Sequence, residues 1–363
     1  MPGERYSGNA GNKNKLPEKL LKPVYIIPVL VVVILVVFFY SRTFYAVNTF
    51  SYTHMTMDTV VEIRFQSSGV RAAEEIRDEV FAEIERLEKQ FSRSVEESDV
   101  VAVNDQAGRR PVTVSPEVFH VTKEALNYAE LSDGAFDPTV APLTDLWGFF
   151  SEEGFPEQDY RVPQSAEIEY ALQLVDYSLV EIDPDKQTIY LPQSGMGLEL
   201  GGIAKGFIVD RSLEILSEAG VKHAYVNAGD IGLLGTRPDG EPWRIGVRNP
   251  RDERDMIAVL PLADKAVDTS GDYERAFEED GVKYHHILDP ATGMPARELA
   301  SVTVIAETTM EADVLSTAAF VLGTKRGMDF IEQIHGAEAI FVTPELEITV
   351  TGGLEDKIEL QQP

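Results

Sequence analysis

The glycine-rich stretch Glu199–Gly206 (ELGGIAKG) connects a short apolar, strand-like run to a segment with helical periodicity at 206–219. Its three glycines allow a backbone to come close to a ligand, and a helix beginning near residue 206 presents unpaired N–H groups that favour an anion. The spacing fits neither the G-x-x-x-x-G-K-[ST] phosphate loop nor the G-x-G-x-x-G dinucleotide fingerprint. By itself the stretch predicts a strand-to-helix turn, serving either backbone geometry or anion binding.

Strands and helices mix without strict alternation on both sides of this turn. The segment Thr59–Phe65 alternates as a strand does, and apolar residues recur at helical spacing through 72–91. Gly220 is placed to cap the helix at 206–219. Further strands are expected at 187–192, 222–227, 301–306, 337–342 and 346–350, and further helices at 115–130, 311–322 and 325–335. The pattern predicts one α+β domain without a separable second domain.

The N-terminus differs from the rest in charge and hydropathy. Residues 1–42 hold six basic and two acidic side chains, and Pro23–Tyr40 is an uncharged, apolar stretch of 18 residues. Since about 20 such residues cross a bilayer, we expect a transmembrane anchor at 23–41. The alternative is a cleavable signal peptide, but its apolar region usually has about 7–15 residues and ends at small residues, unlike Phe38-Phe39-Tyr40.

The distribution of basic residues around this segment predicts its orientation. Residues 1–22 are expected on the cytoplasmic side, and a connector at 42–54 and a domain at 55–360 on the other, because basic residues stay inside. The expected location is therefore the inner or plasma membrane, with an extracytoplasmic domain.

Overall composition excludes several classes of protein. The chain has 32 Lys and Arg against 61 Asp and Glu, a net charge of −29, which argues against a nucleic-acid-binding surface. The absence of cysteine excludes thiol catalysis, disulfides and thiolate metal sites. Any anionic ligand must therefore be bound by a local concentration of positive charge, such as a metal ion or a lysine.

Two later clusters carry residues suited to catalysis. In Tyr284–Gly293 two adjacent histidines precede Asp289; in an extended segment they point to opposite faces, so only one faces a given site. Such a histidine is either a general base or a surface residue beside an Asp-Pro turn. On a predicted helix, Asp313 and Thr317 are four residues apart and share one face. They are either a helix-start acid with a back-bonded threonine, or oxygen ligands for Mg²⁺.

Two loops of small and polar residues, Ser132–Thr139 and Thr269–Tyr273, do not indicate a function by themselves. Together with the other clusters, however, they resemble the ApbE family of FAD:protein FMN transferases. The matching motifs are Met57–Val60, Phe91-Ser92 with Ser98 and Asn104, Asp133–Thr139, Leu200–Gly206 with Asp210, Val226–Ile231, Thr269–Gly271, His286–Pro290 with Thr292-Gly293, and Ala312-Asp313 with Thr317. The family usually has Gly at the positions of Asp58 and Ala228.

The resemblance implies a fold, a reaction and a site. The fold is a single large mixed α/β domain of the ApbE (T-fold-like) type. FAD is the substrate, a hydroxyl of a target-protein Thr attacks the phosphorus on the FMN side, and AMP leaves. Mg²⁺ is held by Asp313, Thr317 and the carbonyl of Ala204. His286 is the candidate base, with Asp289 as helper or FAD contact. The remaining implied FAD contacts are Met57, Ala135, Phe136, Asp137, Lys205, Phe207, Asp210 and Ile287.

The expected partner is a membrane or extracytoplasmic flavoprotein with an acceptor Thr. Two alternatives use the same residues: an extracytoplasmic FAD pyrophosphatase that gives FMN and AMP, and a membrane-anchored flavin-binding protein without turnover. An acid–hydroxyl metal pair together with a histidine favours an enzyme.

Overall fold

The computed structural model describes residues 28, 30–34, 48–57, 59–150, 160–355 and 358–360. The chain divides into two units, 1–47 and 48–363. In the first, residues 28 and 30–34 are helical, and most of the predicted anchor at 23–41 lies outside the described residues. Among the residues that are described, no helix is long and apolar enough to cross a bilayer.

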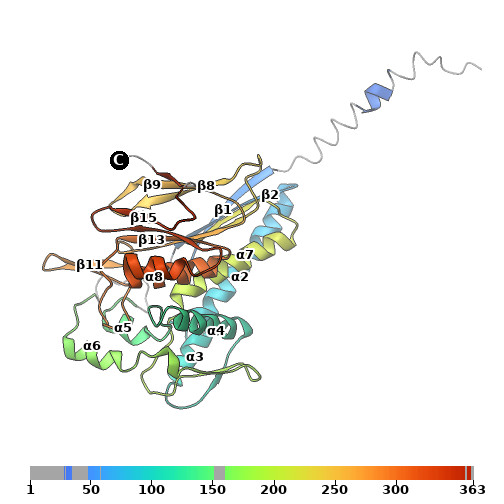
Figure 1. Cartoon of the computed structure of the whole chain (residues 1–363). Helices are drawn as coiled ribbons and strands as arrows, with labels where there is room; N and C mark the ends of the chain where they lie inside the picture. Colours follow the sequence, from blue (N-terminus) through green and yellow to red (C-terminus); the bar gives the residue numbers. More distant parts are fainter. Residues whose placement is uncertain are drawn as a thin grey trace, which may run out of the picture. The chain divides into compact units, whose positions relative to one another are not determined.

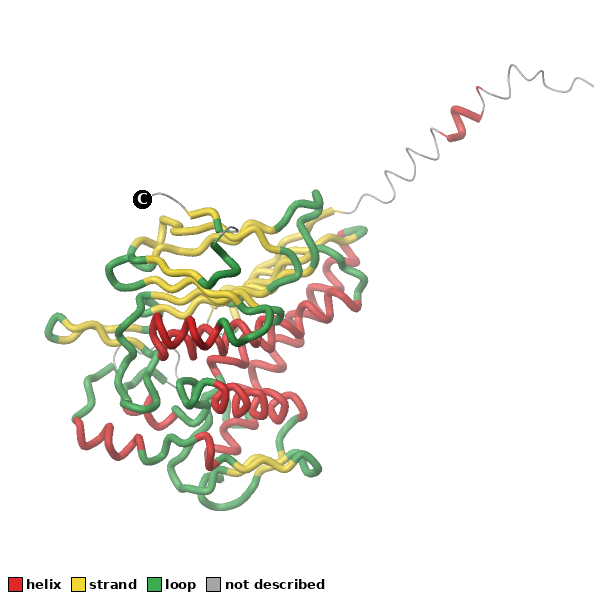
Figure 2. The backbone as a smooth tube through the Cα atoms, viewed as in Figure 1, coloured by secondary structure: helices red, strands yellow, loops and turns green. Residues whose placement is uncertain are grey.

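An eight-stranded, fully antiparallel sheet organises the second unit (Figures 1 and 2). Its strands follow one another across the sheet as β1 (Asn48–Thr56), β2 (Thr59–Ser67), β6 (Ala224–Asn227), β7 (Ile231–Leu234), β10 (Ala266–Gly271), β13 (Ser301–Ala306), β14 (Glu338–Val342) and β15 (Ile348–Val350). Strand β1 covers residues 48–54, which the sequence analysis assigned to the connector.

Helices cover one face of the sheet and a smaller sheet covers the other (Figure 1). The long helices are α2 (Val70–Phe91), α7 (Gly201–Glu218) and α8 (Thr309–Ile331). The smaller sheet has the order β16 (Glu359–Leu360), β9 (Asp252–Leu262) and β8 (Trp243–Asn249). Apolar side chains of β8 and β9 pack with Val267, Ile305 and Ile340 of the main sheet.

A third group of elements lies beyond the helices. It contains α3 (Asp99–Asp105), β3 (Val112–Thr113), α4 (Pro116–Leu131), α5 (Ala141–Leu146), α6 (Ser165–Leu172), a 3-10 turn (Tyr177–Leu179), β4 (Glu181–Asp183) and β5 (Thr188–Tyr190). A separate hairpin, β11 (Ala276–Glu279) and β12 (Val282–His285), projects from the domain (Figure 1).

The predicted mixture of strands and helices in one domain is confirmed, and hydrophobic periodicity explains it. Val61, Ile63 and Phe65 of β2 are at most 1% exposed, as strand alternation requires. Gly220 has a φ of +81° and ends α7 as predicted. The two helices predicted at 311–322 and 325–335 form one element, α8, which breaks at Gly323.

The predicted start of α7 is wrong. The helix begins at Gly201, with non-helical torsions at Gly202, and Gly206 lies inside it. A Cβ at Gly206 would lie 2.4 Å from the carbonyl oxygen of Thr309. Gly206 therefore lets α7 and α8 approach backbone to backbone, and its N–H donates to Asp313 Oδ2 at 3.1 Å instead of being free for an anion.

The Gly206→Ala substitution should destabilise the domain by about 1–3 kcal/mol or more, because the added methyl group overpacks the α7–α8 contact. Urea unfolding monitored by circular dichroism measures the change. Gly352→Ala is the matched control, since a Cβ there meets nothing within 4 Å. Equal unfolding midpoints for the two variants would contradict this explanation of Gly206.

Candidate functional site

Three buried carboxylates, Asp230, Asp268 and Asp313, meet beside the main sheet, each offering an oxygen within 4.8 Å of the others. Asp230 is in the turn between β6 and β7. The pairing of Val267 with Ile231 brings Asp268 of β10 next to that turn. Asp313 comes from the first turns of α8, which packs on β10 and β13. The antiparallel register and one helix thus assemble this acidic triad.

Few hydrogen-bond donors and positive charges face the three carboxylates of the triad. Lys205 Nζ lies 2.6 Å from Asp230 Oδ1, and Ser316 Oγ donates to Asp268 Oδ2 at 2.5 Å. The Oδ2 atom of Asp230 is buried and finds no hydrogen-bond donor among the described residues. When all three carboxylates are ionised, one ammonium group faces three negative charges.

Burial is the main cause of the shifted pKa values of the three carboxylates. Burial, reinforced by the neighbouring carboxylates, raises the pKa of Asp230 to about 7, of Asp268 to about 8 and of Asp313 to about 7. Burial alone would lower the pKa of Lys205, but the charges of the triad outweigh it and raise that pKa, so Lys205 stays protonated. At neutral pH the triad therefore retains protons that a bound cation would displace, because Lys205 alone does not compensate three carboxylates.

Hydroxyl groups and an aromatic ring surround the start of α7. Ser270 Oγ lies 2.8 Å from Ser316 Oγ and 3.4 Å from Thr317 Oγ1. A Cβ at Gly202 would lie 3.3 Å from both Thr317 Oγ1 and the ring of Phe136. Since Ala204 and Lys205 follow in the same turns of α7, the structure brings Phe136 and Thr317 to the same end of this helix.

The two adjacent histidines make different contacts. His285 is 3% exposed, its Nε2 lies 2.6 Å from the carbonyl oxygen of Ala296, and its ring meets Phe320 edge-on. Burial, together with the positive charges of Arg275 and Lys205, lowers the pKa of His286 to about 3, so its imidazole is neutral at neutral pH. The buried Nδ1 atoms of His285 and His286 both have no hydrogen-bond partner among the described residues. His285 uses its Nε2 in the fold, whereas no side-chain hydrogen bond occupies His286 among the described residues, which leaves His286 as the candidate for the base.

Comparison with known proteins places the chain in a family. The ApbE family model matches residues 57–341. The chain belongs to the ApbE family. It is 33% identical over 333 residues to the FAD:protein FMN transferase of Treponema pallidum, covering 86% of this chain and 90% of that protein. It is 36% identical over 305 residues to that of Klebsiella pneumoniae, covering 83% and 92%.

Solved ApbE structures have the same fold. The ApbE protein of Thermotoga maritima superposes with a TM-score of 0.79 at 37% identity, covering 85% of this chain and 99% of that one. The flavin transferase ApbE of Vibrio cholerae superposes with a TM-score of 0.76 at 29% identity, covering 86% and 99%.

Several predicted site residues of this ApbE domain form its framework. The Asp289 carboxylate accepts from Ala291 N at 2.9 Å and from Thr292 Oγ1 at 3.0 Å, which closes the turn after His286. Ile287 is buried, and its carbonyl accepts from Ala296 N at 3.0 Å. These contacts match the turn interpretation of Asp289 and place both residues in the support of the His286 loop.

The carboxylates of Asp137 and Asp210 also accept hydrogen bonds from other residues of the domain. Asp137 accepts from the N–H and hydroxyl of Thr139 at 2.7 and 2.6 Å and from Tyr177 N at 3.1 Å, which fixes the turn bearing Ala135 and Phe136. Asp210 accepts from the first two N–H groups of α8, those of Thr309 and Met310, at 2.8 and 2.9 Å. Asp210 therefore caps the helix that carries Asp313.

Phe207 lies apart from the acidic triad. Two residues after Lys205 on α7, it projects from nearly the opposite side of the helix. Its ring packs against Phe91 and His120, with centroid distances of 5.9 Å to each. The structure groups Phe207 with these rings rather than with the triad.

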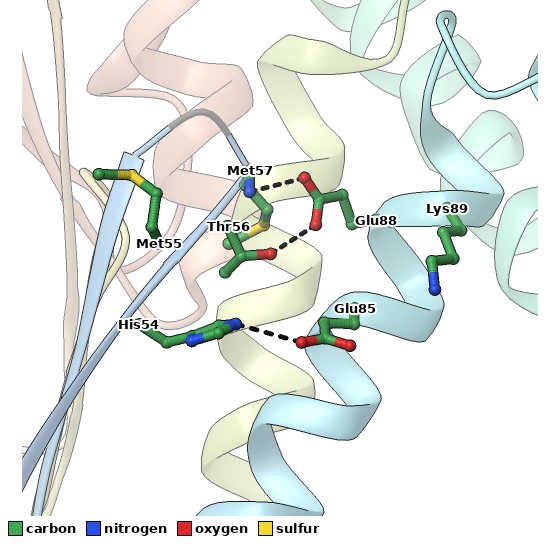
Figure 3. A pocket seen from close by; sticks show the side chains of 7 residues that line it. All are labelled: His54, Met55, Thr56, Met57, Glu85, Glu88 and Lys89. Carbon is green, nitrogen blue, oxygen red and sulfur yellow. Dashed lines mark hydrogen bonds and ion pairs between the residues drawn. The ribbon is translucent and has the colours of Figure 1, made fainter.

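Met57 lies at the tip of the β1–β2 hairpin and lines a pocket of about 510 Å³ with Glu85, Glu88 and Lys89 of α2 (Figure 3). Met57 has a φ of +53°, a conformation that glycine adopts more easily. Glu88 stabilises it by accepting from Met57 N at 2.7 Å and from the Thr56 hydroxyl. The neighbouring Asp58, where the family has Gly, lies outside the described residues.

The Glu88→Ala substitution should cost about 1–3 kcal/mol of stability, because it leaves the Met57 N–H without its acceptor. Glu85→Ala, which removes only the exposed ion pair with His54 in the same pocket, should cost less than about 1 kcal/mol. Urea titration of both variants measures the difference, and equal losses would contradict this function of Glu88.

Asp268, Ser270 and Ser316 were not predicted as site residues, and Asp230 and Ser270 appeared only within the motifs Val226–Ile231 and Thr269–Gly271. The sequence held one local signal for Asp268, which follows the apolar pair Ala266-Val267; the structure shows all three buried in β10. An acidic side chain in such a run requires a partner or a ligand.

Proposed function

We propose that this chain is a Mg²⁺-dependent FAD:protein FMN transferase that attaches FMN through a phosphoester bond to a Thr of a target flavoprotein and releases AMP. The observation that carries the proposal is the buried acidic triad with Lys205, in a chain whose ApbE relatives are named FAD:protein FMN transferases.

The residues present fit a magnesium ion. Mg²⁺ prefers oxygen ligands, and Asp230 Oδ2 is a buried carboxylate oxygen without a donor among the described residues. Asp313, Thr317 and the Ala204 carbonyl would hold the ion, with Asp268 and Asp230 supplying further negative charge. When bound, the ion neutralises charge on the pyrophosphate of FAD and polarises the phosphorus under attack. Lys205 adds a second, permanent positive charge at the same place.

His286 supplies the base for the transfer. A threonine hydroxyl is a weak nucleophile until a base removes its proton. The neutral imidazole of His286 accepts that proton as the hydroxyl oxygen bonds to the FMN-side phosphorus. The bond from this phosphorus to the bridging oxygen breaks, and AMP leaves with the electron pair. The Phe136 turn and the Met57 hairpin tip hold other parts of FAD.

We further propose that residues 23–41 anchor the protein in the inner or plasma membrane, with residues 1–22 cytoplasmic and the catalytic domain extracytoplasmic. The apolar stretch and its basic N-terminal flank support this orientation. An anchor on that face raises the effective concentration of the enzyme near membrane-bound flavoproteins.

Comparing the amount of AMP released with the amount of flavin on the acceptor tests the proposed transferase function. The full-length chain is incubated with FAD, Mg²⁺ and an acceptor protein that the Vibrio cholerae flavin transferase modifies. We expect one AMP released for each flavin that remains on the acceptor in a denaturing gel. Free FMN equal to AMP, with an unlabelled acceptor, would instead indicate an FAD pyrophosphatase. Bound FAD without AMP release would indicate a flavin-binding protein.

A further inference from the structure

Asp272 is a buried carboxylate that joins three segments of the chain near the proposed base. It directly follows β10, the strand that carries Asp268, and it is 7% exposed. Its backbone N–H donates to the carbonyl of Ala300 at 3.0 Å, which fixes it beside the start of β13. Asp272 lies outside the acidic triad and has no part in the mechanism above.

The side chain of Asp272 binds two cations from different elements. Arg251, in the turn between β8 and β9, donates with Nη1 and Nη2 to the two carboxylate oxygens at 2.8 and 2.9 Å. Lys283 of β12 donates to Oδ1 at 3.1 Å. A bidentate arginine–carboxylate pair has a defined geometry, so Asp272 ties the β11–β12 hairpin to a fixed point in the domain.

The alternation of β12 connects this ion cluster to His286. Lys283 and His285 point to one face, where Asp272 and the Ala296 carbonyl hold them. Tyr284 points to the other face, and His286 follows immediately after the strand. On that side Tyr284 packs on Trp147 at a centroid distance of 5.4 Å. Pairing with β11 and the bond from His286 N to the Arg275 carbonyl at 3.0 Å hold His286 within the hairpin. The bond from Lys283 to Asp272 ties that hairpin to the rest of the domain.

We infer that Asp272, through Arg251 and Lys283, is a positioning residue for FMN transfer: it holds the hairpin so that His286 reaches the acceptor hydroxyl. This inference rests on the proposed function, because His286 is the base only in that reaction. Asp272 itself touches neither the acceptor nor the phosphorus.

The test compares Asp272→Asn and Arg251→Met with the unsubstituted full-length chain. Because groups that orient a functional residue typically contribute about 10–100-fold, the kcat of transfer should fall by about that factor. The affinity for FAD, measured by quenching of flavin fluorescence with Mg²⁺ present, should stay within about twofold because the triad is intact. If Asp272→Asn does not fold, Lys283→Met replaces it, since that side chain is 42% exposed.

Arg244→Met is the matched control, because Arg244 makes a similar bidentate pair with Glu359 between β8 and β16. It should leave kcat unchanged. In a His286→Ala background, Asp272→Asn should cause no further loss, since a positioning residue acts only through the group it positions. Full kcat in Asp272→Asn, or an equal loss with and without His286, would overturn the inference. Full activity of His286→Ala would instead overturn the proposed base.

Discussion

An Asp313→Asn chain should lose FMN transfer by about a thousandfold or more, because Mg²⁺ supplies several kcal/mol of charge stabilisation and each 1.36 kcal/mol is a factor of ten in rate. Asparagine still accepts the hydrogen bond that Gly206 N donates to Asp313 Oδ2, so the fold is kept. Mg²⁺ should no longer raise the thermal unfolding temperature of this variant, whereas it raises that of the unsubstituted chain by mass action.

The metal-free Asp313→Asn protein should unfold at a temperature no lower than that of the unsubstituted protein. The folded pKa values of the triad, about 7 to 8, exceed that of an unfolded carboxyl group. The folded state therefore binds protons that the unfolded chain has released, and its stability falls as the pH rises through this range. Removing one carboxylate reduces the repulsion, so the benefit should be larger at about pH 9 than at about pH 6.

Asp99→Asn is the control for both measurements. Asp99 accepts a hydrogen bond from Ser115 N at 2.8 Å and belongs to another part of the domain. Its variant should keep the Mg²⁺-dependent shift. If Asp313→Asn kept the shift as well, the triad would not be the metal site.

A His286→Ala chain should transfer FMN about 10²–10⁴-fold more slowly, the usual contribution of a general base. Its affinity for FAD and its Mg²⁺-dependent rise in unfolding temperature should be preserved, because the triad and Lys205 are unchanged. The rate is measured by stopping the reaction at a series of times and reading the flavin fluorescence of the acceptor in a denaturing gel.

His335→Ala is the matched control, since His335 is an exposed histidine that follows α8. It should transfer FMN at the normal rate. A normal rate in His286→Ala would show that another group takes the proton. Loss of FAD binding in His286→Ala would show that His286 binds substrate instead of acting as the base.

Much of the fold follows from local patterns in the sequence. Strand β2 and helix α2 were predicted within two residues at each end, because each buries one face and so repeats its apolar residues at the period of its backbone. The break of α8 at Gly323 also matched the gap between the two predicted helices. These features depend on a few neighbouring residues, which the sequence displays directly.

Less of the site could be predicted from the sequence, because its residues come together only in the folded chain. Asp313 and Thr317 share a helix face and were identified together, whereas Asp268 joins them through strand register. The start of α7 was misplaced because Gly201 and Gly202 are poor helix formers, and Gly206 was assigned to anion binding because its close contact with Thr309 is tertiary. The resemblance implied Asp210 as an FAD contact, whereas its capping of α8, about 100 residues later, has no local signal in the sequence.

The intact mass of an acceptor protein tests the central claim most directly. An acceptor that the Vibrio cholerae flavin transferase modifies is incubated with the full-length chain, FAD and Mg²⁺, beside the same acceptor with its modified Thr changed to Ala. We expect a gain of one phosphoester-linked FMN on the Thr acceptor and none on the Ala acceptor. An unchanged mass of the Thr acceptor, while FAD is converted to free FMN and AMP, would contradict it.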